Sequence, residues 1–191
     1  MKRQLLFVQG GGAGTHDEWD NKLVDSLQRE LGPEYEIHYP RMPDEDEPSY
    51  VQWKATLERL FGTLTDGAIL VGHSLGGTIL LKVLAELSSV PEFGAIFLIA
   101  APFVGDGGWP AADLQFPPDL GAHLPKGVPV HFFHGVDDEI APLSHVELYA
   151  SAVPQAHVHR LQGRDHQLND DLKEVAAAIL SLEPGRVGSR K

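Results

Sequence analysis

The feature that most constrains the fold is an apolar run that passes through a glycine-flanked serine into a helical pattern. Residues 68–71 read Ala-Ile-Leu-Val, which is typical of a buried strand, and positions 72–76 read Gly-His-Ser-Leu-Gly. Apolar residues then recur at helical spacing, at Ile79, Leu80, Val83, Leu84 and Leu87. The sequence therefore predicts a strand, a tight turn that carries Ser74, and a helix.

This strand, turn and helix are typical of a nucleophile elbow. The glycines allow a sharp chain reversal, because a bulky neighbour would block the turn and cover the serine hydroxyl. A Gly-x-Ser-x-Gly match alone is a weak signal, and the flanking strand and helix give it weight. The alternative is a coincidental tight turn without chemistry.

The composition favours a single globular domain of modest size. The chain has 191 residues, of which 42% are apolar, enough for a hydrophobic core. Its 27 acidic and 15 basic residues give a net charge of -12, which argues against nucleic acid or an anionic membrane as the main partner. The apolar run at 5–8 is too short for a signal peptide or a membrane span, so we expect a cytoplasmic protein. The chain has no cysteine, which excludes a thiol nucleophile and thiolate-bound zinc.

Strand-like and helix-like segments alternate along the chain. The strand-like segments are residues 4–9, 35–39, 68–72, 95–100, 130–134 and 157–161. The helix-like segments are residues 16–31, 49–64, 75–88, 143–151 and 168–182, the first with an apolar face of Trp19, Leu23, Leu27 and Leu31. This rhythm predicts an α/β fold, a doubly wound, mostly parallel sheet of about six strands with helices on both faces. We expect one domain over residues 1–183 and a flexible C-terminal tail over residues 184–191.

Residues 101–127 break this rhythm with a long connection rich in proline and glycine that begins just past a strand end. The connection carries Phe103, Trp109 and Phe116, which we predict to bind substrate as part of a small lid or pocket wall. An equally supported alternative is an ordered surface loop whose aromatic side chains plug the core.

A serine nucleophile needs a base to take its proton and a carboxylate to orient that base. In doubly wound sheets, such partners lie in the loops beyond the carboxyl ends of the strands. The loop after the strand at 130–134 carries Asp137, Asp138 and Glu139, and one of these is the candidate acid. Acidic residues are also common in turns and at helix starts, so the loop could arise without catalysis.

The candidate base is His166, because it lies in the loop that leaves the last predicted strand. His145 falls in the opening turn of a helix, and His157 and His159 alternate within a strand. The pair on that strand could bind a metal, but no third ligand stands at a fitting spacing, so we expect no metal and no cofactor. The remaining histidines, including His73 inside the elbow, are read as structural or exposed.

The oxyanion formed when Ser74 attacks an acyl carbon needs two backbone N–H donors. The residue after the nucleophile, Leu75, supplies one of them. Positions 9–14 read Gln-Gly-Gly-Gly-Ala-Gly and follow the first strand, and here Gly11 is the predicted second donor, with Gly12 in reserve. This segment matches neither the dinucleotide-binding Gly-x-Gly-x-x-Gly pattern nor a phosphate-binding loop with Gly-Lys-Ser/Thr.

Three segments carry a resemblance to a known family: the motif at 72–76, the His-Gly-x-x-Asp segment at 134–138 and the Gly-x-Asp-His loop at 163–166. Through these segments the chain resembles the α/β-hydrolase superfamily over about residues 4–182. Its small size and the glycine cluster followed by Trp19 resemble the compact serine hydrolases related to retinoblastoma-binding protein nine and bacterial YdeN, which lack a large cap domain. The register of these hydrolases implies Asp138 as the acid, with Asp137 as the fallback. Many members have His-Gly where this chain has Gln9-Gly10.

The resemblance implies a serine hydrolase of the carboxylesterase type with Ser74, His166 and Asp138 as its triad and the amides of Leu75 and Gly11 as its oxyanion hole. The expected partner is a small or medium acyl substrate, and the expected state is a monomer or homodimer. Hydrolysis of thioesters, amides or lactones would use the same residues. A non-catalytic binding protein is the alternative from another class, and a haloalkane dehalogenase-like reaction is disfavoured because it needs an aspartate in place of the serine.

Overall fold

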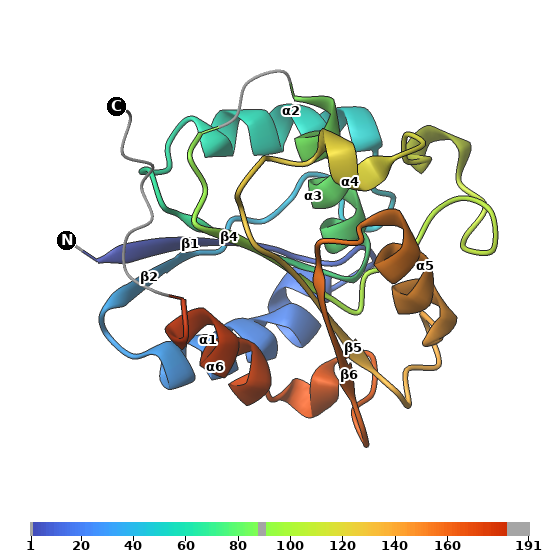
Figure 1. Cartoon of the computed structure of the whole chain (residues 1–191). Coiled ribbons are helices and arrows are strands. Elements are labelled where there is room, and N and C mark those ends of the chain that lie inside the picture. The colour runs from blue at the N-terminus through green and yellow to red at the C-terminus, as the bar shows by residue number, and fades with distance from the viewer. Residues whose placement is uncertain (1, 88–90, 183–191) are drawn as a thin grey trace.

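The computed structural model describes residues 2–87 and 91–182. Its centre is a six-stranded sheet in the order β2-β1-β3-β4-β5-β6, and every neighbouring pair is parallel (Figure 1). The strands are β1 (Arg3–Val8), β2 (Tyr35–His38), β3 (Ile69–His73), β4 (Ala95–Ile99), β5 (Val130–Gly135) and β6 (His157–Leu161). Each strand agrees with its predicted segment to within one residue at either end, so the predicted α/β class and the strand count are confirmed.

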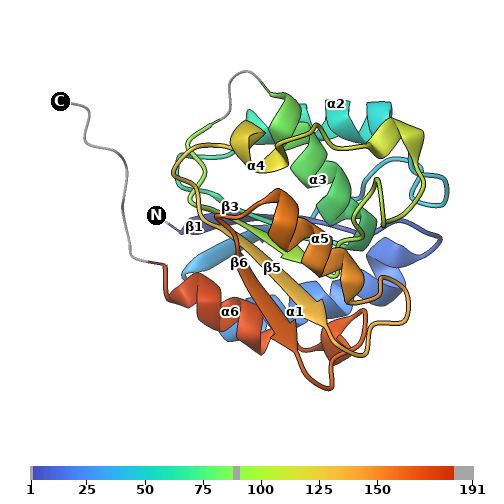
Figure 2. The same cartoon turned by 45° about the vertical axis from the view of Figure 1, so that its right-hand side comes forward.

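Helices cover both faces of the sheet (Figures 1 and 2). On one face lie α2 (Tyr50–Phe61), α3 (Ser74–Glu86), α4 (Leu120–His123) and α5 (Ser144–Ala152). On the other face lie α1 (Asn21–Leu31) and α6 (Lys173–Leu180). Successive residues of β3 point to opposite faces, so Ile69 packs with α1 and α6 in one hydrophobic core while Leu70 packs with Trp53 of α2 in the other. The central strands are therefore apolar throughout, as a parallel sheet covered on both faces requires.

The first helix differs from the prediction at its start. A π-helical segment, η1 (Thr15–Asp20), precedes α1, and the wider turns of a π-helix rotate its side chains out of the register of the helix that follows. Trp19 is 50% exposed, so its predicted place on the apolar face with Leu23 is wrong. Asp20 is fully buried instead.

The last predicted helix, at 168–182, is interrupted. Its first residues form a short 3-10 turn, η3 (Leu168–Asp170), with positive φ angles, and α6 begins only at Lys173. Asp165 Oδ1 accepts the N–H of Asn169, whose side-chain amide donates to the Gly163 carbonyl oxygen. These side-chain bonds stabilise a compact loop in place of a first helical turn.

Other helix ends differ slightly from the prediction, and two predicted segments extend past the residues that the structure describes. The helix α2 ends at Phe61 rather than at residue 64. Residue 88, the predicted end of α3, and the predicted tail at 184–191 lie outside the described residues.

The long connection at 101–127 is largely irregular, as predicted, with the short η2 (Ala112–Leu114) and α4 as its only regular elements in the described structure. Phe103 and Phe116 both pack against Tyr149 of α5, with ring centroids 5.0 Å and 5.7 Å away. These contacts agree with the alternative in which the aromatic side chains of the connection pack on the core. In the described residues no cap domain is inserted.

The sheet order fixes where a site can form. In the sheet, β2 lies on one side of β1 and β3 on the other. The loops after β1 and β3 therefore lead to helices on opposite faces of the sheet. This reversal of strand order opens a crevice at the carboxyl ends of these two strands, where ligands bind in open α/β sheets. The glycine-rich loop after β1 and Ser74 after β3 meet at this point.

Candidate active site

Ser74 stands on a strained turn between β3 and α3. Its φ angle is 49°, which is unfavourable for a residue with a side chain and costs about 1–3 kcal/mol. A Cβ on Gly72 would lie 2.6 Å from the Gly77 Cα, and a Cβ on Gly76 would collide with the Gln9 carbonyl oxygen. Glycine at both positions therefore allows α3 to pack closely against β3 and the loop after β1.

The structure joins Ser74, His166 and Asp138 by hydrogen bonds. The Ser74 hydroxyl oxygen lies 2.9 Å from Nε2 of His166, and Nδ1 of His166 lies 2.8 Å from Oδ2 of Asp138. Because a carboxylate only accepts, Nδ1 carries the proton and Nε2 is left to accept from the serine hydroxyl. The three residues lie at the ends of β3, β5 and β6, and His166 and Asp138 are only 8% and 5% exposed.

The second oxygen of Asp138 is fixed by its own loop. Oδ1 accepts the N–H groups of Ile140 and Ala141 at 2.9 Å and 2.8 Å. Burial acts to raise the pKa of Asp138, but the hydrogen bond and charge of His166 and the two backbone amides outweigh it and hold the pKa below its ordinary value. The neighbouring Asp137 is exposed. The structure thus places Asp138, and not Asp137, against His166.

His134 supports the same loop, a role that the sequence did not indicate. Its Nε2 lies 2.6 Å from the Ala141 carbonyl oxygen, to which it donates, and 3.5 Å from Oδ2 of Asp138. Burial lowers the pKa of His134 below its ordinary value, which favours the neutral ring. His134 is the first residue of the His-Gly-x-x-Asp segment, but that pattern serves to place Asp138 and assigns no contact to the histidine.

The glycine-rich loop leaves one amide free beside the serine. The amides of Gly10 and Gly12 donate to a carboxylate and to a backbone carbonyl, at 2.7 Å and 2.6 Å. Within the described residues the amide of Gly11 has no acceptor, and a Cβ on Gly11 would lie 2.8 Å from Cδ2 of Leu75. Leu75 is in the first turn of α3, where amides have no acceptor within the helix. The geometry therefore favours Gly11 over Gly12 as the partner of Leu75.

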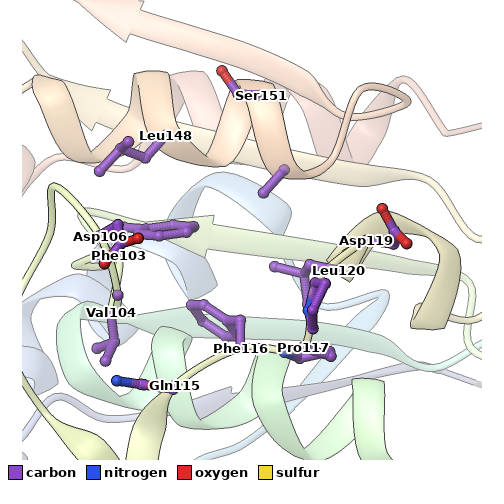
Figure 3. Close-up of a pocket in the computed structure, with 13 residues that line it drawn as sticks. Phe103, Val104, Asp106, Gln115, Phe116, Pro117, Asp119, Leu120, Leu148 and Ser151 are labelled. Atoms are coloured by element: carbon purple, nitrogen blue, oxygen red, sulfur yellow. The ribbon is translucent and has the colours of Figure 1, made fainter.

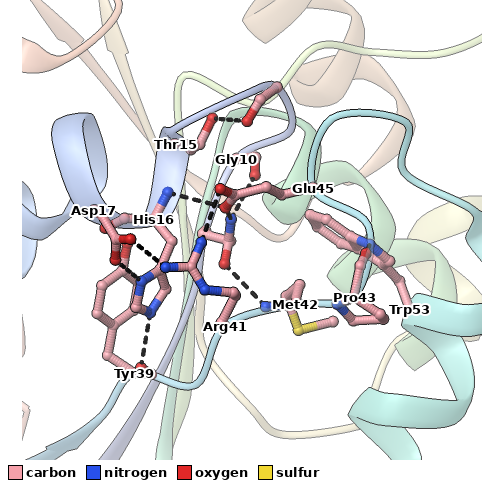
Figure 4. Close-up of polar contacts among 12 residues, drawn as sticks. Gly10, Thr15, His16, Asp17, Tyr39, Arg41, Met42, Pro43, Glu45 and Trp53 are labelled. Carbon is pink, nitrogen blue, oxygen red and sulfur yellow. Dashed lines mark hydrogen bonds and ion pairs between the residues drawn. The ribbon is translucent and has the colours of Figure 1, made fainter.

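Gln9 links the glycine-rich loop to the loop after β2, whose Met42 and Glu45 are labelled in Figure 4. Its side-chain oxygen accepts the Met42 amide at 2.9 Å, and its side-chain nitrogen donates to Glu45 at 2.5 Å. Glu45 also accepts from the His16 amide at 3.1 Å and from Arg41 at 2.9 Å. Gln9, which stands where many relatives of the predicted family have histidine, is thus the centre of a network that fixes this loop.

The predicted substrate-binding residues are only partly brought together. Phe103, Phe116 and Leu120 of the connection at 101–127 line a pocket of about 480 Å³, with Leu148 of α5 on the opposite side (Figure 3). Trp109 is not among the lining residues and packs its ring edge against a histidine of α5.

This pocket is separate from the serine. None of Ser74, Asp138 and His166 lines it. Pro102 precedes the lining residue Phe103, and its carbonyl oxygen accepts the Thr78 hydroxyl at 2.6 Å, one turn along α3 from the serine. The connection that carries Phe103 is therefore bonded to α3 about one helical turn beyond the nucleophile.

The histidines on β6 have a neighbour on β5. His131 Nδ1 lies 3.2 Å from His159 Nε2, a distance that fits a hydrogen bond between the two rings, and His157 stacks on His131. In residues 2–87 and 91–182 no three His, Asp or Glu side chains are grouped so that they could hold a metal ion. Nor does any helix of that part of the chain have the length and apolar character needed to cross a membrane.

Comparison with known proteins agrees with this architecture. The profile of the alpha/beta hydrolase family matches residues 5–184, so the chain belongs to this family, and the prediction of a hydrolase of this superfamily is confirmed. A search of curated proteins gives no significant match.

Solved structures show the same fold at low sequence identity. The ydeN gene product from B. subtilis has a TM-score of 0.71 and 22% identity over 95% of this chain and 98% of that chain. The esterase RhEst1 from Rhodococcus sp. has a TM-score of 0.69 and 16% identity over 95% and 92% of the two chains. The esterase domain from a Rhodothermus marinus protein has a TM-score of 0.64 and 21% identity over 93% and 84%. The predicted YdeN-like fold is confirmed, and the likeness to retinoblastoma-binding protein nine stays a prediction.

Proposed function

We propose that this protein is a serine hydrolase of the carboxylesterase type that cleaves a small or medium acyl ester through an acyl-enzyme. The observation that carries the proposal is the unbroken chain of hydrogen bonds from the Ser74 hydroxyl through His166 to Asp138. Ser74 would be the nucleophile, His166 the general base and Asp138 the residue that orients the base.

In the acylation step, Ser74 Oγ attacks the acyl carbon while its proton moves to Nε2 of His166. Asp138 holds the Nδ1–H tautomer and stabilises the imidazolium that forms. The negative charge on the substrate oxygen would be stabilised by the amides of Leu75 and Gly11, for which residues 2–87 and 91–182 supply no acceptor. The imidazolium then gives its proton to the leaving alcohol as the ester bond breaks.

In the deacylation step, water takes the place of the alcohol. His166 accepts a proton from the water, whose oxygen attacks the acyl carbon bound to Ser74, and the carboxylic acid leaves as the serine regains its proton. Each residue thus returns to its starting protonation state.

Two similar structures are named as esterases, which supports an ester as the substrate of this chain as well. The acyl group would extend from Ser74 toward Phe103, where the pocket begins. The protein would then act on a small molecule as a monomer or homodimer in the cytoplasm, without a cofactor.

The test is hydrolysis of p-nitrophenyl acetate and butyrate, with thioester, amide and lactone analogues in parallel. Wild type is expected to hydrolyse at least one ester, whereas Ser74→Ala and His166→Ala reduce kcat/KM to the background rate. Ser181→Ala removes an exposed hydroxyl from another part of the chain and is expected to leave the rate unchanged. Equal trace activity in wild type and Ser74→Ala would contradict the proposal and favour a binding protein, while a preference for another acyl class would correct only the ester assignment.

A further inference from the structure

A second histidine–carboxylate pair lies directly behind the serine. Nδ1 of His73, the residue before Ser74, lies 2.9 Å and 3.0 Å from the two carboxylate oxygens of Asp20, which is 53 positions away in the sequence. Asp20 is 0% exposed and His73 is 1% exposed, so the pair is shielded from water. Neither residue contacts the Ser74 hydroxyl, and the proposed mechanism does not use them.

The pair connects three loops of the candidate site. Asp20 Oδ2 accepts the amide of Gly10 at 2.7 Å, which fixes the loop that presents Gly11. His73 precedes Ser74 on the elbow, and its Nε2 lies 3.1 Å from the backbone carbonyl oxygen of His166. One buried pair therefore contacts the glycine-rich loop, the elbow and the loop of the general base.

We propose that Asp20 and His73 form a buried imidazolium–carboxylate pair that positions the oxyanion donors, the nucleophile and the base relative to one another. Both are positioning residues, because they act through Gly10, Ser74 and His166. Their catalytic consequence rests on the proposed serine hydrolase function, whereas the charge state of the pair can be tested without it.

The hydrogen-bond partners determine the charge of His73. A backbone carbonyl oxygen only accepts, so Nε2 must carry a proton to bond to the His166 carbonyl. Nδ1 faces a carboxylate that also accepts the Gly10 amide and, at 3.4 Å, the Gln167 side chain. A carboxylate with several donors favours its ionised form, so Nδ1 carries the second proton.

The charged surroundings agree with this assignment. Burial acts to lower the pKa of His73, but the charge and hydrogen bond of Asp20 outweigh it and raise the pKa above its ordinary value. Burial likewise acts to raise the pKa of Asp20, and His73 outweighs it, so that pKa is lowered. The other titratable groups that face the pair are Asp138 and His166 from the neighbouring loops and Tyr39 just after β2.

Burying such a pair is expensive unless every polar atom is satisfied, and removing one member leaves the other charge unpaired. A misplacement of about 1 Å at a catalytic group can reduce the rate about 10²-fold. We therefore expect Asp20→Asn to lower kcat by about tenfold to a hundredfold with little change in KM. His73→Gln, which cannot donate to both partners in the same geometry, should behave similarly.

The charge state can be measured by nuclear magnetic resonance of protein labelled with ¹⁵N-histidine, with the His73 signals assigned by their loss in His73→Gln. In spectra recorded from about pH 6 to 9, both ring nitrogens of His73 are expected to stay protonated beyond the pH near 6.5 at which free histidine loses one proton. A His73 ring with one unprotonated nitrogen at pH 8 in folded wild type would overturn the proposal.

The positioning role is tested by the rate of reaction with a fluorophosphonate across the same pH range. The wild-type rate should rise to a plateau at the high end of this range. In Asp20→Asn, His73 loses its counter-ion and burial favours the neutral ring, so the rate should stay below that of wild type throughout the range. Asp25→Asn on α1 and His123→Gln on α4 make the same chemical changes at exposed positions and should match wild type.

The outcomes separate the two proposals. Wild type that binds no fluorophosphonate contradicts the hydrolase function, while the resonance measurement still decides the charge of His73. Wild type that reacts, with Asp20→Asn and His73→Gln folded and equally fast at every pH, overturns the positioning role. If Asp20→Asn fails to fold, the reaction rate of His73→Gln still tests the positioning role, and the wild-type resonances still test the charge of His73.

Discussion

Replacement of Asp138 by asparagine changes few atoms and should reverse the orientation of the proton on His166. Asp138 Oδ1 accepts two backbone amides, from Ile140 and Ala141, at 2.9 Å and 2.8 Å. In Asp138→Asn, the side-chain oxygen must stay toward these two N–H donors, because a side-chain NH₂ group there would face donors only. The NH₂ group is therefore directed at Nδ1 of His166.

This orientation disables the general base. A donor at Nδ1 requires that nitrogen to be unprotonated, so the proton moves to Nε2, which then points at Ser74 as a donor. Ser74 loses the acceptor for its proton while the packing stays nearly unchanged. In a Ser-His-Asp triad the same substitution lowers kcat by about 10⁴-fold, which corresponds to about 5 kcal/mol of transition-state stabilisation. We expect a loss of about 10³–10⁴-fold here.

The assay is steady-state hydrolysis of p-nitrophenyl acetate at pH 8, with circular dichroism and thermal unfolding on the same samples. Asp137→Asn is the matched control, because it makes the same change at the exposed neighbouring residue. Asp137→Asn should stay within about twofold of wild type, as surface changes away from a site usually have small effects. Folded Asp138→Asn with more than a tenth of the wild-type kcat would refute the tautomer argument. A larger loss of kcat in Asp137→Asn than in Asp138→Asn would identify Asp137 as the acid of the triad.

Three further predictions follow from the packing and charges. The pKa of Asp138 is lowered in the folded state, so its contribution to stability is present above the unfolded pKa of about 3.9 and is lost as the pH falls through the lower folded pKa. Thermal unfolding from pH 2 to 7 should therefore show wild type losing stability relative to Asp138→Asn below about pH 4. A stability difference that stays constant over this range would contradict the argument. Gly76→Ala should destabilise the fold by about 3 kcal/mol or more, because the new Cβ collides with a backbone carbonyl; Gly62→Ala, in a helical conformation with its nearest neighbour 3.5 Å away, should be tolerated in the same denaturant titration. Phe116→Ala should lower kcat/KM for an octanoyl ester about tenfold relative to an acetyl ester, since only a longer chain reaches the pocket; equal losses on both esters would place the acyl group elsewhere.

Local patterns were enough to predict the sheet and the elbow. Each strand is a run of apolar or alternating residues bounded by turn residues, and the six predicted segments match β1 to β6 closely. Ser74 follows from glycines on either side of it, and His166 from its place just beyond the last strand. Asp138 could not be separated from Asp137 by spacing, because the two differ only in which one turns toward the base. The family register made that choice.

The remaining features depend on contacts between distant residues. Asp20 and His73 are 53 positions apart, and nothing in either local sequence indicates that they pair. The exposure of Trp19 depends on the π-helical segment, which helical periodicity does not predict. The separation of the pocket at Phe103 and Phe116 from the serine depends on how a long irregular connection packs, and that is set by tertiary contacts.

The central claim, an activated Ser74, is tested most directly by intact-mass analysis after incubation with a fluorophosphonate, followed by peptide mapping. One adduct on wild type, located on Ser74, absent in Ser74→Ala and formed far more slowly in His166→Ala, is the predicted result. Folded wild type without an adduct, or with an adduct that persists in Ser74→Ala, would contradict it.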